Sequence, residues 1–348
     1  MQGNRWARRF AGIAVVSLIV MGCAKSSGAT TAPTTAAASS GPVASGSAPA
    51  GSAAVAAATC KGDGTKGAVK MMINQWVGAA ANVAVAQCLL QQMGYKVTTS
   101  TLAEEVAWQG FSTGEVDVIL ENWGHPDLEK KYIATDKLAQ DDGPNGVTGI
   151  IGWYVPGWMV DKYPDITDWN NLNKYADMFK TTESGGQGQL LDGDPSFVTN
   201  DEALVTNLKL NYKVVYAGSE AALIQAFRQA ETNKKPLIGY FYDPQWFMSE
   251  VPLVKVNLPP YTAGCDADAA KIACDYPKYD LNKIVATKFA QADGPAYKLI
   301  KAFKWTNEDQ NLVAKSIAED KMDDEKAAQQ WVDANPDKVN AWLKAVQA

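Results

Sequence analysis

Residues 69–100 read VKMMINQWVGAAANVAVAQCLLQQMGYKVTTS, and this stretch decides the fold. A short apolar segment, Val69 to Ile73, is followed by a helical pattern from Asn82 to Met93 and by a second strand-like segment, Lys96 to Ser100. Strand-length apolar segments that alternate with helical patterns predict β-α-β units, and hence a parallel sheet flanked by helices. We therefore expect an α/β fold that begins with this unit.

The same alternation continues along the chain. A helical pattern at Glu104 to Thr113 and an apolar segment at Val116 to Glu121 complete the first unit. A second set begins near Gly149, and its predicted elements in order are residues 150–155, 189–191, 201–208, 213–216, 220–229 and 236–242. After Val254 the pattern is mixed, and it ends in helices predicted at 294–303, 307–319 and 324–334, with a last short helix after Pro336. We expect this C-terminal part to pack on the first set.

A body of about 290 residues is long for one hydrophobic core and usually divides into two lobes. We assign residues 60–150 and 250–348 to lobe I and residues 151–249 to lobe II, with crossings near 149–155 and 242–254. Between two such lobes lies a cleft, where the carboxyl ends of strands and the N-termini of helices converge. The sequence thus predicts a two-lobed fold with a hinge and an interlobe ligand cleft.

The N-terminus carries an export signal. Three arginines, Arg5, Arg8 and Arg9, precede an apolar run at residues 10–21 that is too short to span a bilayer as a mature helix. We interpret residues 1–23 as a secretion signal, and leave open whether export follows the general or the twin-arginine route.

The signal ends at Val20-Met21-Gly22-Cys23, which resembles the lipobox of bacterial lipoproteins and implies a diacylglycerol on Cys23; an ordinary signal with a stray cysteine is the alternative. Residues 24–59 consist almost wholly of Ala, Ser, Thr, Gly and Pro, a composition that does not form a packed core. We interpret them as a flexible tether with an r.m.s. span of roughly 30 to 35 Å. The only membrane contact we expect is the lipid, on the extracytoplasmic face of the bacterial cell membrane.

Cysteine usage agrees with export, because the other four cysteines form an even set in an oxidising compartment. Of the three possible pairings we prefer Cys60 with Cys88, since the first helix would run back toward the segment before the first strand, and Cys265 with Cys274, which closes a short loop. A metal site is the alternative; we reject it because the four share no CxxC spacing and the single histidine, His125, stands apart. The net charge of −6 argues against nucleic acid, and we expect no cofactor.

Aromatic residues gather at the ends of the predicted strands. They are Trp76, Trp123, Trp153, Tyr154, Tyr240 and Tyr242. Any one of them could serve ordinary packing. Several around one cavity form a box whose π faces attract a cation, and a trimethylammonium group suits such a box because its charge is diffuse and its methyls offer no hydrogen-bond donors. The pattern favours a site for a quaternary ammonium compound.

Five segments carry a resemblance to a known family. They are Asn74-Gln75-Trp76-Val77-Gly78, Gly114 to Val118 leading to Glu121-Asn122-Trp123-Gly124-His125, Gly152 to Pro156, Asp192 to Phe197, and Gly239 to Pro244. In these segments, residues 66–348 resemble the substrate-binding lipoproteins of ABC-type glycine betaine, choline and carnitine importers, which have a type II periplasmic-binding fold. The resemblance implies a binding protein that delivers a small ligand to a membrane permease.

The resemblance also implies roles for single residues. Trp123 matches the tryptophan that forms one wall of the family's aromatic cage, and Trp76 matches an aromatic of the choline-type members. Tyr240 or Tyr242 supplies a wall from the second lobe, and the two are not separated by the sequence. Phe197 stands where some members have tryptophan, which leaves open whether that wall is kept or moved to residues 153–154.

The other end of the ligand needs polar partners. Residues 196–199 resemble the family's turn whose main-chain N–H groups hold a carboxylate, and His125 could add a donor. Choline has a hydroxyl instead, and Asp194 or Asp243 would favour such a ligand. The predicted polar-end residues are His125, Asp194, Ser196, Val198 and Thr199.

We thus expect a monomeric, lipid-anchored extracytoplasmic receptor of an ABC importer that closes around a quaternary ammonium solute. A receptor for a polar amino acid is the first alternative, although no Arg or Lys clamp for a carboxylate stands at the strand ends. A surface-anchored carbohydrate-active enzyme is the second, since acids such as Glu121 lie near the proposed cleft; no nucleophile elbow accompanies them.

Overall fold

The computed structural model describes residues 59–347. The predicted signal peptide, its Cys23 and all of the predicted tether except Thr59 lie outside these residues. No helix between residues 59 and 347 is long and apolar enough to cross a membrane.

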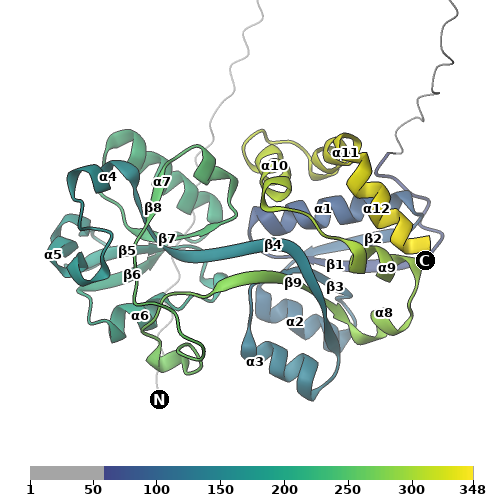
Figure 1. Cartoon of the computed structure of the whole chain (residues 1–348), viewed down its shortest axis with the longest axis horizontal. Helices are drawn as coiled ribbons and strands as arrows, with labels where there is room; N and C mark the ends of the chain where they lie inside the picture. Colours follow the sequence, from purple (N-terminus) through teal and green to yellow (C-terminus); the bar gives the residue numbers. More distant parts are fainter. Residues whose placement is uncertain (1–58, 348) are drawn as a thin grey trace, which may run out of the picture. The chain divides into compact units, whose positions relative to one another are not determined.

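The described chain builds one nine-stranded sheet with helices on its faces (Figure 1). The strands are β1 Ala68–Ile73, β2 Lys96–Thr101, β3 Val118–Asn122, β4 Ala139–Pro156, β5 Gly188–Asp192, β6 Tyr212–Tyr216, β7 Gly239–Asp243, β8 Leu253–Lys255 and β9 Lys278–Ala286. The helices are α1 Val77–Gln92, α2 Glu104–Thr113, α3 Pro126–Glu129, α4 Gly157–Lys162, α5 Leu172–Tyr175, α6 Asp201–Asn207, α7 Glu220–Asn233, α8 Thr287–Gln291, α9 Pro295–Ala302, α10 Asn307–Ala318, α11 Asp324–Ala334 and α12 Pro336–Gln347. The strand order is β2-β1-β3-β9-β4-β7-β5-β6, and β8 pairs with β4 beside this path.

The first lobe is built on the predicted β-α-β-α-β unit. Strand β1 pairs in parallel with β2 and with β3, which confirms the parallel arrangement expected for this part of the chain. Successive strand residues point to opposite faces. Accordingly Met71 belongs to the core cluster under α1, and Met72 belongs to the separate cluster formed with Trp108 and Phe111 of α2. The two helices thus cover opposite faces of the sheet (Figure 1).

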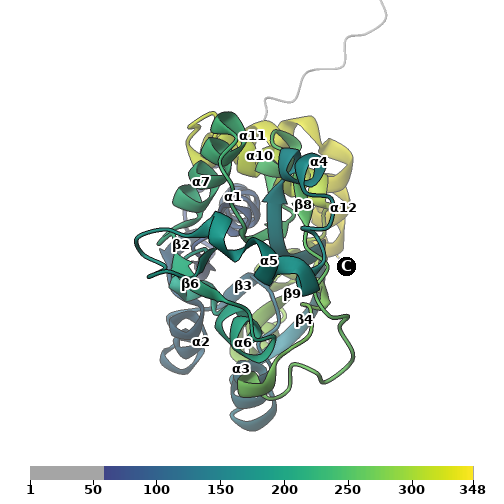
Figure 2. The same ribbon diagram turned by 90° about the vertical axis from the view of Figure 1, so that its left-hand side faces the viewer.

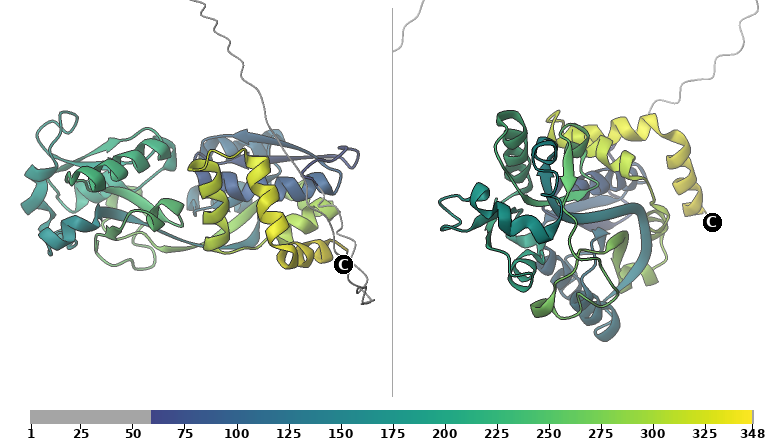
Figure 3. Two further views of the ribbon diagram at one scale, coloured as in Figure 1. Left: turned by 90° about the horizontal axis from the view of Figure 1, so that it is seen from above. Right: turned by 60° about the vertical axis from the view of Figure 1, so that its left-hand side comes forward.

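The second lobe repeats the plan. Strand β5 pairs in parallel with β6 and with β7, and α6 and α7 lie on opposite sides of these strands (Figure 2). The C-terminal helices belong to the first lobe, since α10 and α11 both pack against α1 (Figure 3). That placement agrees with the expectation from the sequence.

The sheet as a whole is mixed rather than parallel, because β9 lies antiparallel between β3 and β4, and β4 lies antiparallel to β7. The sequence did not predict β9. Its nine residues include the buried Lys283, whose ammonium donates to the carbonyls of Lys301 and Phe303 at 2.7 and 2.9 Å. Because buried lysines are rare unless paired, a lysine in a sequence is normally interpreted as an exposed residue. Lys283 therefore made this segment look unlike a buried strand.

Strand β4 makes the first crossing between the lobes: residues 139–150 pair with β9 and residues 150–154 pair with β7. The second crossing differs from the one expected at residues 242–254. Strand β8 pairs with the end of β4, and the Asn207 amide of α6 donates to the Ile272 carbonyl at 2.8 Å. Residues 253–275 therefore pack with the second lobe, and the chain returns at the start of β9.

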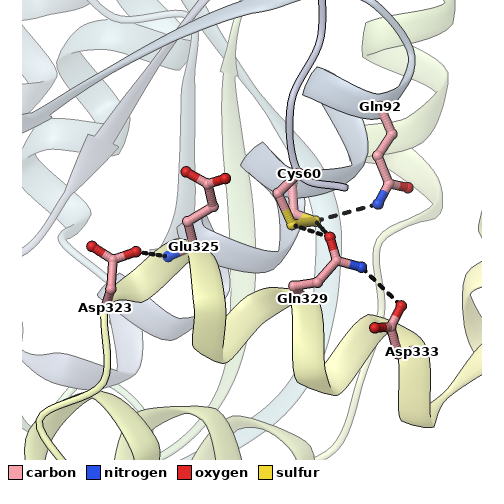
Figure 4. Close-up of a disulfide and its surroundings, with 7 residues drawn as sticks. Cys60, Gln92, Asp323, Glu325, Gln329 and Asp333 are labelled. Carbon is pink, nitrogen blue, oxygen red and sulfur yellow. Dashed lines mark hydrogen bonds between the residues drawn. A yellow bond between two sulfur atoms is a disulfide. The ribbon is translucent and has the colours of Figure 1, made fainter. Parts of the chain in front are cut away.

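Both preferred disulfides, Cys60–Cys88 and Cys265–Cys274, are present. The first ties the segment before β1 to α1. Gln329 of α11 reaches this disulfide, and its amide also donates to Asp333 at 2.8 Å (Figure 4). The crosslink thus lies where the segment before β1 meets α1 and α11.

The two crosslinks should contribute unequally to stability. The Cys60–Cys88 bond spans 28 residues and Cys265–Cys274 spans 9, so the loop-closure relation assigns about 3.5 and about 2.5 kcal/mol to them. We expect Cys60→Ser/Cys88→Ser to lower the free energy of unfolding more than Cys265→Ser/Cys274→Ser, as measured by urea denaturation of the chain from residue 59 onward. An equal loss, or a larger loss from the short loop, would contradict this ranking.

Candidate ligand-binding site

A cavity of about 620 Å³ lies between the two lobes. The first lobe contributes residues that follow β1 and β3, and the second contributes β7 and the turn after β5. A further wall comes from the segment that contains the Cys265–Cys274 disulfide and leads into β9. The aromatic lining residues are Trp76, Trp123, Phe197, Tyr240, Tyr242, Tyr276 and Tyr279.

Six of these rings form a continuous series. The ring centroids of Tyr279 and Trp123 are 5.6 Å apart, and those of Trp123 and Tyr242 are also 5.6 Å apart. The series continues from Tyr242 to Tyr240 at 6.2 Å, from Tyr240 to Phe197 at 6.1 Å, and from Phe197 to Trp76 at 5.7 Å. These separations are typical of stabilising aromatic pairs. Rings from both lobes therefore hold one another in place around the cavity.

Two glycines make room for these rings. A Cβ atom at Gly149 would lie 2.4 Å from the Trp123 ring, and one at Gly193 would lie 2.6 Å from the Phe197 ring. Such approaches are closer than nonbonded carbon atoms tolerate, so any other residue would displace a ring. The absence of a side chain at these two positions therefore allows the Trp123 and Phe197 rings to take their places in the walls of the site.

The indoles of the first lobe share a buried acceptor. Glu121 of β3 is 1% exposed, and its Oε1 accepts hydrogen bonds from Nε1 of Trp76 and Nε1 of Trp123, both at 2.8 Å. Its Oε2 accepts from the Asn82 amide of α1 at 2.6 Å. Burial raises the pKa of Glu121 to about 7, although the indole hydrogen bonds favour the ionised form.

A second buried carboxyl joins the lobes. Glu220 at the start of α7 accepts hydrogen bonds from the Tyr242 phenol, from the Gln245 amide at 2.8 Å and from the main-chain N–H of Val77 at 2.9 Å. Val77 is the first residue of α1, so a side chain of the second lobe binds a helix N-terminus of the first. Burial raises the pKa of Glu220 against these hydrogen bonds. One wall residue, Tyr242, is thereby coupled to the contact between the lobes.

Trp153 and Tyr154 do not line the cavity. The Trp153 indole is turned to the buried carboxylate of Asp201, to which it donates at 2.8 Å, and the Tyr276 phenol donates to the same oxygen at 2.7 Å. Tyr154 projects to the other face of β4, where it packs against Phe241. On β4 the residue that lines the cavity is Ile151. Phe197 lines the cavity, and Tyr276 and Tyr279 are further aromatic lining residues.

Of the predicted polar-end residues, three line the cavity and two do not. His125, Val198 and Thr199 are lining residues. Asp194 instead caps the short 3₁₀ turn Pro195–Phe197, since its carboxylate accepts from the Ser196 main-chain N–H at 2.8 Å. Asp194 and Ser196 thus stabilise the turn without lining the cavity.

His125 forms an ion pair with Glu104 at the start of α2, with 2.8 Å between Nε2 and Oε2. Burial opposes a charged imidazole, but the hydrogen bond and the charge of Glu104 prevail and raise the pKa of His125. The imidazole is therefore already engaged with a carboxylate of its own lobe.

The turn after β5 has an unusual backbone. Val198 has a φ of 52°, a left-handed conformation that strains a β-branched residue and is found mostly where function requires it. Within residues 59–347 the main-chain N–H groups of Val198 and Thr199 have no hydrogen-bond partner. Successive right- and left-handed residues can aim such groups at an anion.

The charged residues of the lining are almost all acidic. Besides the ion-paired Glu104, they are Glu105, Asp127, Glu129 and Asp266. Among the described lining residues there is no Lys or Arg, and His125 is the only basic group. No group of three or more His, Cys, Asp or Glu residues in the described chain could hold a metal ion. The cavity therefore carries an excess of negative charge around aromatic walls.

Sequence reasoning named Glu121 only as an acid near the cleft in the enzyme alternative. It missed the role of Glu121 as the acceptor for the two indoles, although Glu121 stands two positions before Trp123. It also missed Tyr276 and Tyr279, because they lie just before and within the unrecognised β9. Glu220 gave no signal, since its role depends on a contact with the other lobe.

Two α/β lobes joined by crossing strands, with a ligand-sized aromatic cavity between them, define a two-lobed ligand receptor. Residues 67–334 match the family described as the substrate-binding domain of the ABC-type glycine betaine transport system (OpuAC). The chain belongs to this family. It is thus the substrate-binding component of an importer rather than an enzyme, and it works outside the cytoplasm with a permease.

Relatives agree with this placement. The trimethylamine N-oxide-binding protein of Pelagibacter ubique is 25% identical over 256 residues, which cover 71% of this chain and 81% of that protein. Lactococcal OpuAC in its closed form with glycine betaine has a TM-score of 0.61 at 22% identity, over 79% of this chain and 99% of that chain. An ABC-transporter choline-binding protein with choline has a TM-score of 0.65 at 18% identity, over 80% and 96%. The two structures show the same two-lobed fold.

The position of Trp153 generates a prediction that separates packing from binding. Trp153→Phe removes the hydrogen bond to the buried Asp201, so we expect a loss of about 1 to 3 kcal/mol in the free energy of unfolding. Because the ring lies outside the cavity, ligand affinity should change by less than about twofold. Urea denaturation and calorimetric titration of the same preparation measure the two effects, and a large loss of affinity with unchanged stability would contradict the assignment.

Proposed function

We propose that this protein binds a small methylated ammonium compound, of the glycine betaine or choline kind, in the cavity between its lobes and presents it to an ABC permease. The observation that carries the proposal is the series of six aromatic rings from both lobes. Each ring face that meets a diffuse cation contributes on the order of 0.5 to 2 kcal/mol, more when water is excluded. Four faces at the upper value contribute about 8 kcal/mol, which corresponds to micromolar binding.

The family and the relatives support the same ligand class. The names of the three relatives described above give trimethylamine N-oxide, glycine betaine and choline as their ligands. All three compounds carry a nitrogen with three methyl groups, which is the part that an aromatic cage recognises. The lack of Lys and Arg among the described lining residues argues against the alternative of a polar amino acid, whose carboxylate usually requires such a clamp.

The polar end of the ligand has two candidate settings. The free main-chain N–H groups of Val198 and Thr199 suit the carboxylate of a betaine. The acidic lining suits a ligand with a net positive charge, such as choline. Comparison of glycine betaine with choline decides between them.

Closure follows from the contacts between the lobes. A ligand that touches rings of both lobes favours the arrangement in which Glu220 meets the N-terminus of α1. In this arrangement Arg228 of α7 also contacts Glu319 at the end of α10, with 3.0 Å between Nη2 and Oε2. We infer that the closed form is the one a permease recognises.

The central prediction concerns Trp123. Its indole donates to Glu121 of the first lobe, and its ring packs between its two neighbours in the series, Tyr242 and Tyr279. Trp123→Ala should weaken binding at least tenfold, about 1.4 kcal/mol, because it removes a complete cage face. Calorimetric titration of the disulfide-intact body from residue 59 onward with glycine betaine, choline, carnitine, trimethylamine N-oxide and a polar amino acid measures it.

The matched control is Trp169→Ala, which removes a partly buried tryptophan outside the cavity and should leave affinity unchanged. Binding of none of the methylated compounds to the unaltered protein would overturn the proposed function. Equal binding by the Trp123 variant would exclude this cage.

We further propose that the mature protein is held at the membrane through a lipid on Cys23 and acts as a monomer. In a bacterial host the full-length chain should incorporate radiolabelled palmitate, and Cys23→Ser should abolish the label and release the protein from the membrane fraction. Cys60→Ser offers a control that alters a cysteine of the folded body. Retained label in the Cys23 variant would rule out the anchor.

A further inference from the structure

A buried acid without a basic partner lies behind two walls of the aromatic cage, against the indole N–H groups of Trp76 and Trp123. Glu121 is 1% exposed, and within the described residues the charged groups that act on it most are two further acids, Glu220 and Glu104. Buried carboxylates are normally paired with a cation, because removal of the charge from water is costly. An unpaired one inside a receptor for cations has a candidate partner, which is the ligand.

The geometry also ties this carboxyl to the walls. A single oxygen of Glu121 accepts the N–H groups of both indoles, so neither Trp76 nor Trp123 can rotate without breaking a hydrogen bond in a buried place. The other oxygen is held by the Asn82 amide, which also donates to the Gln310 side chain at 2.8 Å. Asn82 of α1 therefore fixes the Glu121 carboxyl, and the carboxyl in turn fixes the indoles of Trp76 and Trp123.

We propose that Glu121 is a positioning residue of the ligand site: it orients Trp76 and Trp123 and, as a carboxylate behind their rings, supplies the negative charge that the bound cation meets. This inference rests on the proposed function and goes beyond it, because it assigns proton release to ligand binding. Cation entry favours the ionised form, so a protein in which Glu121 is partly protonated must lose that proton when the ligand binds.

The direction of the pH dependence follows from burial. Because burial raises the pKa of Glu121 to about 7, a substantial part of the free protein carries the proton at neutral pH. The bound cation lowers that pKa, so affinity should rise as pH increases through about 7 and should fall in acid. His125 also lines the cavity with a raised pKa, and Glu220 of the opposite lobe titrates from a raised pKa as well. The experiment must separate these three groups.

The test uses choline and glycine betaine, neither of which titrates between pH 5.5 and 8.5. For the unaltered protein we expect affinity to increase up to about tenfold across this range, which corresponds to a pKa change of about one unit. Titrations near pH 6.5 in buffers of different ionisation enthalpy should show release of a fraction of one proton for each ligand bound.

Glu121→Gln keeps an oxygen for both indoles and removes the charge. The variant is expected to fold, because the Asn82 amide can turn its Oδ1 to accept from the new amide while the Gln310 amide turns its Nε2 to donate to that Oδ1. Neither of these two atoms has a hydrogen-bond partner among the described residues. We expect binding at least fivefold weaker at pH 8 and a nearly flat pH profile. Glu121→Ala, which also frees the indoles, should bind more weakly still.

The controls are His125→Gln and Glu220→Gln, each of which should keep the rise of affinity with pH. Failure of the unaltered protein to bind choline, glycine betaine or any of the other methylated compounds at any pH would overturn the proposed function and this inference together. Binding with a flat profile, or an unchanged profile in Glu121→Gln, would overturn the role of Glu121 alone. If the variant fails to fold, the proton count of the unaltered protein still decides, since release of no proton contradicts the proposal.

Discussion

The antiparallel pairing of β4 with β9 is the constraint on which the rest of the structure depends. Residues 139–150 of β4 pair with β9, and the same strand then continues into the second lobe to pair with β7. Ile150 pairs with both β9 and β7, so the sheet continues through the crossing; before it, the β4–β9 register shifts between Asp141 and Thr148. Because Gly149 and Ile151 on β4 and Tyr279 on β9 all contact the cavity or its rings, the strands that join the lobes also form the floor of the site.

Above this floor, the aromatic walls are held by buried carboxyls. Glu121 fixes the two indoles of the first lobe, Glu220 fixes Tyr242, and Asp201 accepts from Tyr276. An aromatic ring alone has little directional preference within an apolar wall, whereas an N–H or O–H group on its edge must find an acceptor when buried. The carboxyls thus add fixed acceptors to rings that already pack against one another, and burial raises the pKa of each of these carboxyls.

The parts of this arrangement that the sequence predicted are those specified locally. Strands β1 to β3 and β5 to β7 follow from short apolar segments beside helical patterns, and Trp76, Trp123, Phe197, Tyr240 and Tyr242 stand directly at or after such strands. The second crossing could not be placed in this way, because the buried Lys283 interrupts the apolar pattern of β9. The hydrogen-bond partners of Lys283 are carbonyls at the C-terminal end of α9, which the local sequence does not reveal.

Without β9, neither Tyr279 nor the disulfide-bearing wall before it could be assigned to the cleft. Trp153 shows the converse limit: it stands at a predicted strand end like the cage residues, and only the position of Asp201 turns its indole away from the cavity. Local pattern thus identifies which strand ends are aromatic. Which of those rings face the ligand depends on buried polar partners that are distant in sequence.

The charge of the site completes the physical picture. Acids outnumber bases among the described lining residues. Behind the two indoles of the first lobe, the buried acid Glu121 has no basic partner in the described chain. A permanent Arg or Lys beside it would neutralise the carboxylate, lower its pKa and repel a cationic ligand. Its absence leaves the free protein with an unfavourable buried charge or a bound proton, either of which the ligand can relieve. If Glu121 acts as proposed, the receptor gains selectivity for cations from this cost in its empty state.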